Sequence, residues 1–157
     1  MKHAIYSPMR YISGLLFLLL MASLVVSGCV SSGDQAFTDS MKTSQATIGQ
    51  MANDAIAAEN AGDHVKAADL ATNISDYATK ESPVFHGMQV SSSYVTARDD
   101  YVRHLNNAST GWKAWATSIT LTQAGKNAEA ASPKRESDTD LAASVDWLNK
   151  AKAALPE

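Results

Sequence analysis

The stretch YVTARDDYVRHLNNASTGWKAWATSI, residues 94–119, decides the fold class. Every third or fourth residue in it belongs to a single stripe in which only Arg98 is charged: Tyr94, Arg98, Tyr101, Leu105, Ala108, Trp112, Trp115 and Ile119. This spacing places the stripe along one face of an α-helix. The stretch therefore predicts a helix of about 30 residues that ends at Gly125. A helix break at residues 106–111 stays open, because Gly111 lacks a side chain and weakens a helix.

Similar apolar stripes predict two helices before this one. The first covers residues 34–61, with Asp34 as its N-cap. The second covers residues 64–80 and is capped by Asp63. Proline disfavours a continuing helix, so Ser82-Pro83 is expected to end the second helix or to begin the next one.

A fourth helix is predicted to begin at Ser137 or Asp138, after a polar connection over residues 126–137 that contains Pro133. Its stripe is Leu141, Val145, Leu148, Ala151 and Leu155. Alanine, the strongest helix former, supplies 24 of the 129 residues that follow Gly28. The sequence therefore predicts an all-α protein, an antiparallel four-helix bundle made of two helical hairpins.

Two short segments repeat the same pattern 63 residues apart. AGDHVKAA at residues 61–68 and AGKNAEAA at residues 124–131 share alanine and glycine, four variable residues and two alanines. Glycine directly after a helix is typical of a tight helix-ending turn. The repeat indicates either shared turn chemistry or an internal duplication.

The first 28 residues have the pattern of a signal peptide. Lys2, His3 and Arg10 precede an uncharged run from Tyr11 to Val26, which is 16 residues long. A spanning helix needs roughly 17 to 25 apolar residues. The segment therefore fits a signal peptide better than a permanent transmembrane span, although an uncleaved signal anchor remains an alternative.

The segment Val26-Ser27-Gly28-Cys29 resembles the lipobox of prokaryotic lipoproteins. That resemblance implies a diacylglycerol on the Cys29 sulfur, cleavage before Cys29 and attachment to membrane lipid. It divides the chain into a lipoprotein signal peptide (1–28), a lipidated cysteine with a short tether (29–33) and a helical domain (34–157). The alternative is a free or buried cysteine after an ordinary signal sequence.

This resemblance also sets the expected location, which is extracytoplasmic. Residue 30 is Val and not Asp, which in a two-membrane bacterium favours the outer membrane. In a one-membrane bacterium or an archaeon, the anchor would lie in the outer face of the plasma membrane. The sequence leaves the host open, and with it the use of two matches to the N-glycosylation motif, at Asn73 and Asn107.

Charge and cysteine content exclude several function classes. The formal net charge is −3, and it becomes −5 once the leader with Lys2 and Arg10 is removed, which does not suit nucleic acid. One cysteine allows neither an internal disulfide nor a thiolate metal cage. No motif for a serine or cysteine nucleophile is present. We therefore expect no enzyme activity and no cofactor.

Five aromatic residues are the candidate binding residues: Tyr94, Tyr101, Trp112, Trp115 and Trp147. They fill an alanine-rich core, or some of them line a pocket or a partner surface between the last two helices. Asp100 and His104 lie four residues apart, a spacing that suits two metal ligands. They flank the apolar stripe, so we interpret them as a solvated pair and expect no metal.

Two functional hypotheses follow. The first is a non-enzymatic interaction or scaffold domain of the cell envelope, which contacts another envelope protein or a surface layer. The alternative is a small-molecule binding module with an aromatic-lined pocket between helices.

Overall fold

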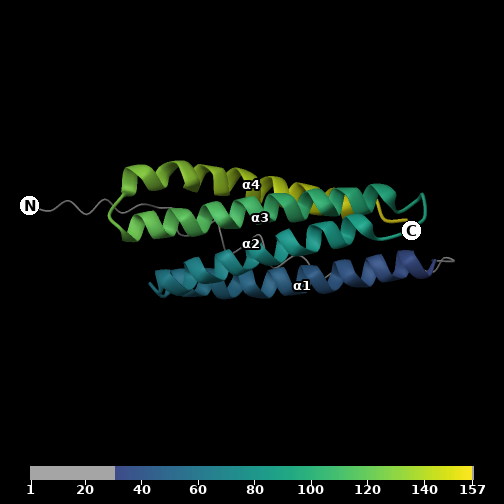
Figure 1. Cartoon of the computed structure of the whole chain (residues 1–157), viewed down its shortest axis with the longest axis horizontal. Coiled ribbons are helices and arrows are strands. Elements are labelled where there is room, and N and C mark those ends of the chain that lie inside the picture. Colours follow the sequence, from purple (N-terminus) through teal and green to yellow (C-terminus); the bar gives the residue numbers. More distant parts are fainter. Residues whose placement is uncertain (1–30, 157) are drawn as a thin grey trace, which may run out of the picture.

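The computed structural model describes residues 31–156 and consists of four α-helices (Figure 1). They are α1 (Ser32–Asn60), α2 (His64–Gly87), α3 (Val95–Gln123) and α4 (Asn127–Ala153). No strand occurs in this part of the chain. The all-α prediction is confirmed. The predicted signal peptide, Cys29, Val30 and Glu157 lie outside the described residues.

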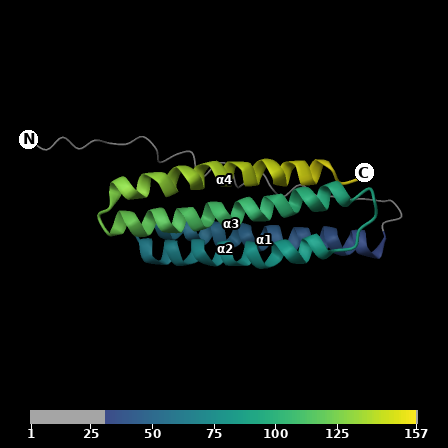
Figure 2. The same ribbon diagram turned by 45° about the horizontal axis from the view of Figure 1, so that its top comes forward.

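Consecutive helices pack side by side in opposite directions, which confirms the antiparallel four-helix bundle (Figures 1 and 2). The first residues of α1, the connection between α2 and α3, and the last residues of α4 lie at one end, called here the terminal end. The α1–α2 and α3–α4 turns lie at the opposite end, called here the turn end.

Both turns at the turn end have the same backbone geometry. Gly62 and Gly125 adopt left-handed φ angles of 80° and 74°, which glycine reaches without steric cost. In each turn the residue after glycine donates its amide to a carbonyl five positions earlier, at 2.9 Å: Asp63 to Ala58 and Lys126 to Leu121. This is the Schellman motif. The repeated sequence pattern therefore does encode shared turn chemistry.

The start of α1 differs from the prediction that Asp34 is the N-cap. Ser31 is the N-cap, and its hydroxyl accepts the Asp34 amide at 3.2 Å. The Asp34 carboxylate in turn accepts the Ser31 amide at 3.3 Å, which completes a capping box. Ser32 and Gly33, which were expected to belong to the tether, are helical.

The prediction that the second helix ends before Pro83 is wrong, because α2 continues to Gly87. Pro83 is exposed and lies near the end of the helix, so its missing amide leaves only the carbonyl of the exposed residue Thr79 without a helical donor. The extra turn places Phe85 fully inside the core, where its ring lies 4.6 Å from the Tyr101 ring. Burial of a phenylalanine is worth roughly 1.5–3 kcal/mol and offsets the lost bond.

α4 begins at Asn127 and not at Ser137 or Asp138, so the predicted polar connection is wrong. Its first turns run past Pro133 and bury only Ala130 before Ser137. The Ala130 carbonyl accepts the Ser118 hydroxyl of α3 at 3.2 Å. These first turns of α4 pack through one alanine and one serine and therefore have no apolar stripe. For this reason the apolar periodicity of the sequence did not indicate them.

α3 is continuous through Gly111, which settles the question left open by the sequence. A Cβ atom at residue 111 would lie 2.9 Å from the Leu141 side chain and 3.0 Å from the Leu141 backbone nitrogen. Real Cβ atoms are rarely this close to other atoms. Glycine is therefore what lets α3 and α4 approach closely at this level.

Large and small side chains occupy different parts of the core. Aromatic rings fill the terminal end: Phe37, Phe85, Tyr94 and Tyr101. Alanine dominates near the turn end: Ala52, Ala55, Ala58, Ala67 and Ala71. Among the described residues, only Val65 and Val84 are large apolar side chains that are exposed, by 63% and 53%.

Candidate functional site

Two of the five candidate aromatics are core residues at the terminal end. Tyr94 and Tyr101 are buried, and the Phe37 ring meets the Tyr94 ring edge to face at 6.4 Å. The Tyr101 hydroxyl donates to the Met41 carbonyl of α1 at 3.5 Å. Burial raises the pKa of Tyr101, so the phenol stays neutral. These rings hold the helices together and are closed to a ligand.

The three tryptophans do not line a common space. Trp112 is buried, Trp115 is half-buried, and their rings meet edge to face at 5.3 Å. The hydrogen bonds from Ser118 to Ala130 and from His104 to Ser144 set the register of α3 against α4 and place Trp112 level with residue 136. Trp147 is 11 residues further along α4, which is about 16 Å.

Trp147 lies in a separate cluster with two cations. The Arg103 guanidinium carbon lies 4.6 Å from the centre of the indole ring, and the Lys150 ammonium lies 3.9 Å from it. Cations at this distance are attracted to the face of the ring. Arg103 also pairs with the Asp100 carboxylate at 3.3 Å. Lys150 follows Trp147 by three residues, and this spacing could have indicated their contact from the sequence. The contact of Arg103 with Trp147 depends on the register of α3 against α4 and could not be read from the sequence.

The prediction that Asp100 and His104 form a solvated pair is wrong. Both are buried, with exposed fractions of 9% and 6%, because α4 covers this face of α3. The His104 Nδ1–H donates to the Ser144 carbonyl at 2.9 Å, and the Ser144 hydroxyl donates to the His104 carbonyl at 3.2 Å. Burial, aided by the positive charge of Lys152, lowers the pKa of His104 to about 4. The imidazole ring is therefore neutral and links α3 to α4 through a hydrogen bond.

The two matches to the glycosylation motif contribute their serines to the α2–α3 contact. The Ser75 and Ser109 hydroxyls are 3.2 Å apart, and the Thr79 hydroxyl lies 2.7 Å from Ser109. Asn73 is exposed, and the Asn107 side chain donates to the Arg103 carbonyl at 2.9 Å. These serines therefore have a packing role in the bundle.

The first turn of α1 is clamped to the α2–α3 connection at the terminal end. The Asp34 carboxylate accepts the Ser91 amide at 2.7 Å. Burial alone would raise the pKa of Asp34, but hydrogen bonds from Ser91 and Ser31 outweigh it, so the pKa is lowered. A Cβ atom on Gly33 would collide with the Gln89 carbonyl oxygen, so this contact requires glycine. Sequence periodicity gave no sign of this clamp.

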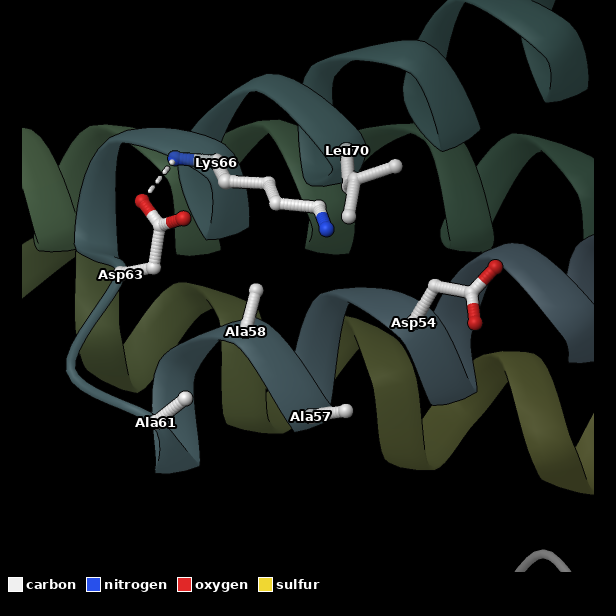
Figure 3. A pocket seen from close by; sticks show the side chains of 7 residues that line it. All are labelled: Asp54, Ala57, Ala58, Ala61, Asp63, Lys66 and Leu70. Atoms are coloured by element: carbon white, nitrogen blue, oxygen red, sulfur yellow. Dashed lines mark hydrogen bonds between the residues drawn. The ribbon is translucent and has the colours of Figure 1, made fainter.

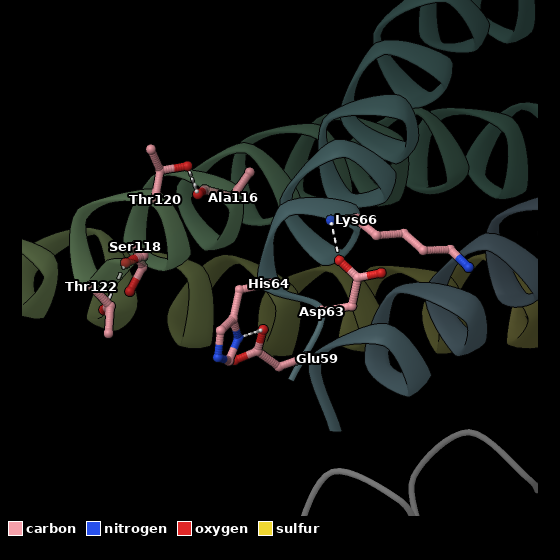
Figure 4. Close-up of polar contacts among 8 residues, drawn as sticks. All are labelled: Glu59, Asp63, His64, Lys66, Ala116, Ser118, Thr120 and Thr122. Carbon is pink, nitrogen blue, oxygen red and sulfur yellow. Dashed lines mark hydrogen bonds and ion pairs between the residues drawn. The ribbon is translucent and has the colours of Figure 1, made fainter. Parts of the chain in front are cut away.

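A shallow groove lies between α1 and α2 at the turn end (Figure 3). Its lining residues are Asp54, Ala57, Ala58, Ala61, Asp63, Lys66 and Leu70. The Asp63 side chain caps α2 by accepting the Lys66 amide at 3.2 Å, as predicted for this residue. Beside the groove, His64 Nδ1 lies 2.8 Å from Glu59 (Figure 4). The groove combines a floor of methyl groups with charged rims.

Comparison with protein-family models, with curated proteins and with solved structures found no match to this chain. Within residues 31–156, no group of three or more histidine, cysteine, aspartate or glutamate side chains is arranged to hold a metal ion. None of the helices described is both long and apolar enough to cross a bilayer.

Proposed function

We propose that this chain is a lipid-anchored, extracytoplasmic helical domain that acts in the cell envelope by interaction and not by catalysis. The observation that carries the proposal is the position at which α1 begins. Ser31, the N-cap of α1, is only two residues after Cys29, the cysteine of the lipobox-like segment. α1 therefore begins next to the residue that cleavage and acylation would make the new amino terminus.

Acylation of Cys29 would attach the domain firmly. Each buried CH₂ of an acyl chain contributes about 0.8 kcal/mol, and two chains hold a protein far longer than one. Two Cα–Cα steps separate Cys29 from Ser31, a reach of at most about 8 Å. The terminal end would lie close to the lipid headgroups of an outer membrane or of the outer face of a plasma membrane.

The turn end would then face away from the membrane. A 29-residue helix is about 43 Å long, so the turn-end groove would stand well above the lipid surface. Its charged rims and methyl floor suit contact with another envelope protein or with a surface layer. We propose this end as the part of the domain that partners reach.

A small-molecule binding module is the weaker proposal. It needs aromatic side chains around a shared space, yet Trp112 and Trp147 are about 16 Å apart along the bundle. Trp147 also has two cations against its ring. The geometry gives this alternative no specific support.

Fractionation of cells that produce Cys29→Ser tests the anchor. The wild-type chain should enter the detergent phase and incorporate a fatty-acid probe, whereas Cys29→Ser should lose the probe and keep its leader. Ser27→Ala, which keeps a small residue in the lipobox, is the matched control and should mature normally. Equal probe incorporation by wild type and Cys29→Ser would contradict the anchor.

Photo-crosslinking in intact cells tests the interaction role. A photoreactive residue in place of Ala57, in the turn-end groove, should give a defined crosslinked species. The matched control is Ala46, an exposed residue halfway along α1. The proposal fails if both positions give the same background in cells that need this protein.

A further inference from the structure

The two ends of the bundle differ in charge. At the terminal end, residues 31–36, 84–99 and 149–156 contain three basic and two acidic residues, a net charge of +1: Arg98, Lys150, Lys152, Asp34 and Asp99. Asp34 is buried in its clamp, and Asp99 pairs with Arg98 at 2.8 Å. Of the two remaining lysines in these segments, Lys150 is exposed and Lys152 is half-buried.

The turn end has the opposite sign. Residues 54–69 and 119–132 contain five acidic residues and two lysines, a net charge of −3: Asp54, Glu59, Asp63, Asp69, Glu129, Lys66 and Lys126. Over the described residues of these segments, the terminal end is thus less acidic than the turn end.

Apolar and aromatic groups accompany the lysines at the terminal end. Val84, in the last turn of α2, is one of two large apolar side chains exposed in the described part of the chain. Leu155, after the end of α4, is half-buried. Trp147 lies six residues before the end of α4, about 9 Å up the bundle, with Arg103 and Lys150 against its ring. Indole rings with neighbouring cations are typical of the membrane interface.

We propose that the terminal end of the bundle rests on an anionic lipid surface, with Lys150 and Lys152 against the headgroup phosphates and Val84 at the interface. This inference rests on the proposed function, which brings this end within reach of the membrane. The clamp from Asp34 to Ser91 fixes the entry of the chain, so lipid contact sets the orientation of the whole bundle. The lysines recognise the lipid surface by its negative charge.

Environment-sensitive fluorophores at two matched positions test the contact. Val84→Cys and Val65→Cys place a probe at the terminal end and at the turn end, at similarly exposed residues. The mature protein is reconstituted into vesicles of phosphatidylcholine, with or without phosphatidylglycerol. The probe at position 84 should shift to shorter wavelength and resist iodide quenching in anionic vesicles. The probe at position 65 should stay in water in both.

Charge removal tests the role of the lysines. Each basic residue near an anionic surface strengthens binding by about five-fold, so Lys150→Gln with Lys152→Gln should weaken the contact roughly thirty-fold. Lys126→Gln with Lys134→Gln removes the same charge away from the terminal end and should have no effect. About 1 M salt, which screens charges beyond about 3 Å, should expose the probe at position 84.

Three outcomes would overturn the inference. These are equal quenching at positions 84 and 65, equal protection in zwitterionic and anionic vesicles, and unchanged protection without Lys150 and Lys152. The intact mass of the labelled protein reports the anchor separately. One fluorophore together with two acyl chains supports the anchor, whereas two fluorophores show a free Cys29 thiol and overturn the proposed function whatever the emission.

Discussion

The aromatic terminal end and the alanine-rich turn end show two ways to pack the same four helices. At the terminal end, the Phe37 ring meets Phe85 at 6.0 Å, and the Phe85 ring meets Tyr101 at 4.6 Å. At the turn end, the buried side chains of α1 and α2 are mostly single methyl groups, such as those of Ala55 and Ala67. A ring buries 150–250 Å² and contributes several times as much apolar area as a methyl group.

This contrast indicates that most of the stability comes from the terminal end. The terminal end gains its stability from interlocked rings and from the Asp34 clamp. The turn end has a smaller apolar cluster, in which Ile119 packs with Ala58 and Ala67, and it relies more on helix propensity and on two backbone turns. We therefore expect slow amide exchange around the rings and faster opening around Gly62 and Gly125.

The largest expected effect comes from truncating a ring at the terminal end. Phe85→Ala removes a fully buried side chain and leaves a cavity, so the free energy of unfolding should fall by about 3–5 kcal/mol. Ala55→Gly, at the turn end, should cost only about 1 kcal/mol. Denaturant titration of both variants measures the contrast. Equal losses would contradict the division into a strong and a weak end.

Acid should weaken the terminal half before it affects the clamp. Burial holds the pKa of His104 at about 4, against an ordinary value of 6.5. Above pH 6.5 the ring is neutral in both states, and between pH 6.5 and 4 only the unfolded chain takes up the proton. The free energy of unfolding should therefore fall by about 3 kcal/mol over that range.

The variant His104→Gln should lose this dependence, while His86→Gln, at an exposed histidine, should keep it. Asp34 has a lowered pKa, so its contribution is present above its ordinary pKa of 3.8 and is lost only below it. Denaturant titration at several pH values separates the two windows. A flat profile between pH 6.5 and 4 in the wild-type protein would contradict the burial of a neutral His104.

Two glycines in helix interiors should respond in opposite directions. Gly111→Ala forces a methyl group against Leu141 and should destabilise the protein by about 1–3 kcal/mol. Gly49→Ala meets nothing within 4 Å and should stabilise α1 by about 0.5–1 kcal/mol. Thermal denaturation of the pair tests whether α3 and α4 touch as closely as described. Stabilisation by both substitutions would refute that contact.

The two turns should lose stability by the same amount. Gly62→Ala and Gly125→Ala each force a left-handed conformation on alanine, at about 1–2 kcal/mol. Because the two turns share the same hydrogen bonds, the losses should agree to within about 0.5 kcal/mol. Chemical denaturation of both variants measures them. A loss confined to one turn would show that the matching geometry does not reflect matching energetics.

The sequence predicted the parts of the fold that depend on local chemistry. The stripe from Tyr94 to Ile119 identified α3, Gly62 identified the α1–α2 turn, and Gly125 identified the end of α3. These signals are strong because burial on one helix face and a positive φ angle each restrict the residue types allowed. The all-α class and the antiparallel order followed from them.

The errors arose where tertiary contacts outweigh local signals. Phe85 holds α2 together past Pro83, although proline alone argues for an end. The first turns of α4 bury Ala130 and Ser137, which do not look apolar in a sequence. The same limit applies to the candidate site, because the burial of His104 and the contact of Arg103 with Trp147 both depend on α4 lying over α3.

The central claim is that the folded domain is tied to a membrane through Cys29, directly before α1. The most direct test is the intact mass of the protein extracted from its native membrane. The account predicts the mass of residues 29–157 plus a diacylglyceryl group, with or without a further acyl chain on the new amino terminus. The mass of the unmodified polypeptide, with or without residues 1–28, would contradict it.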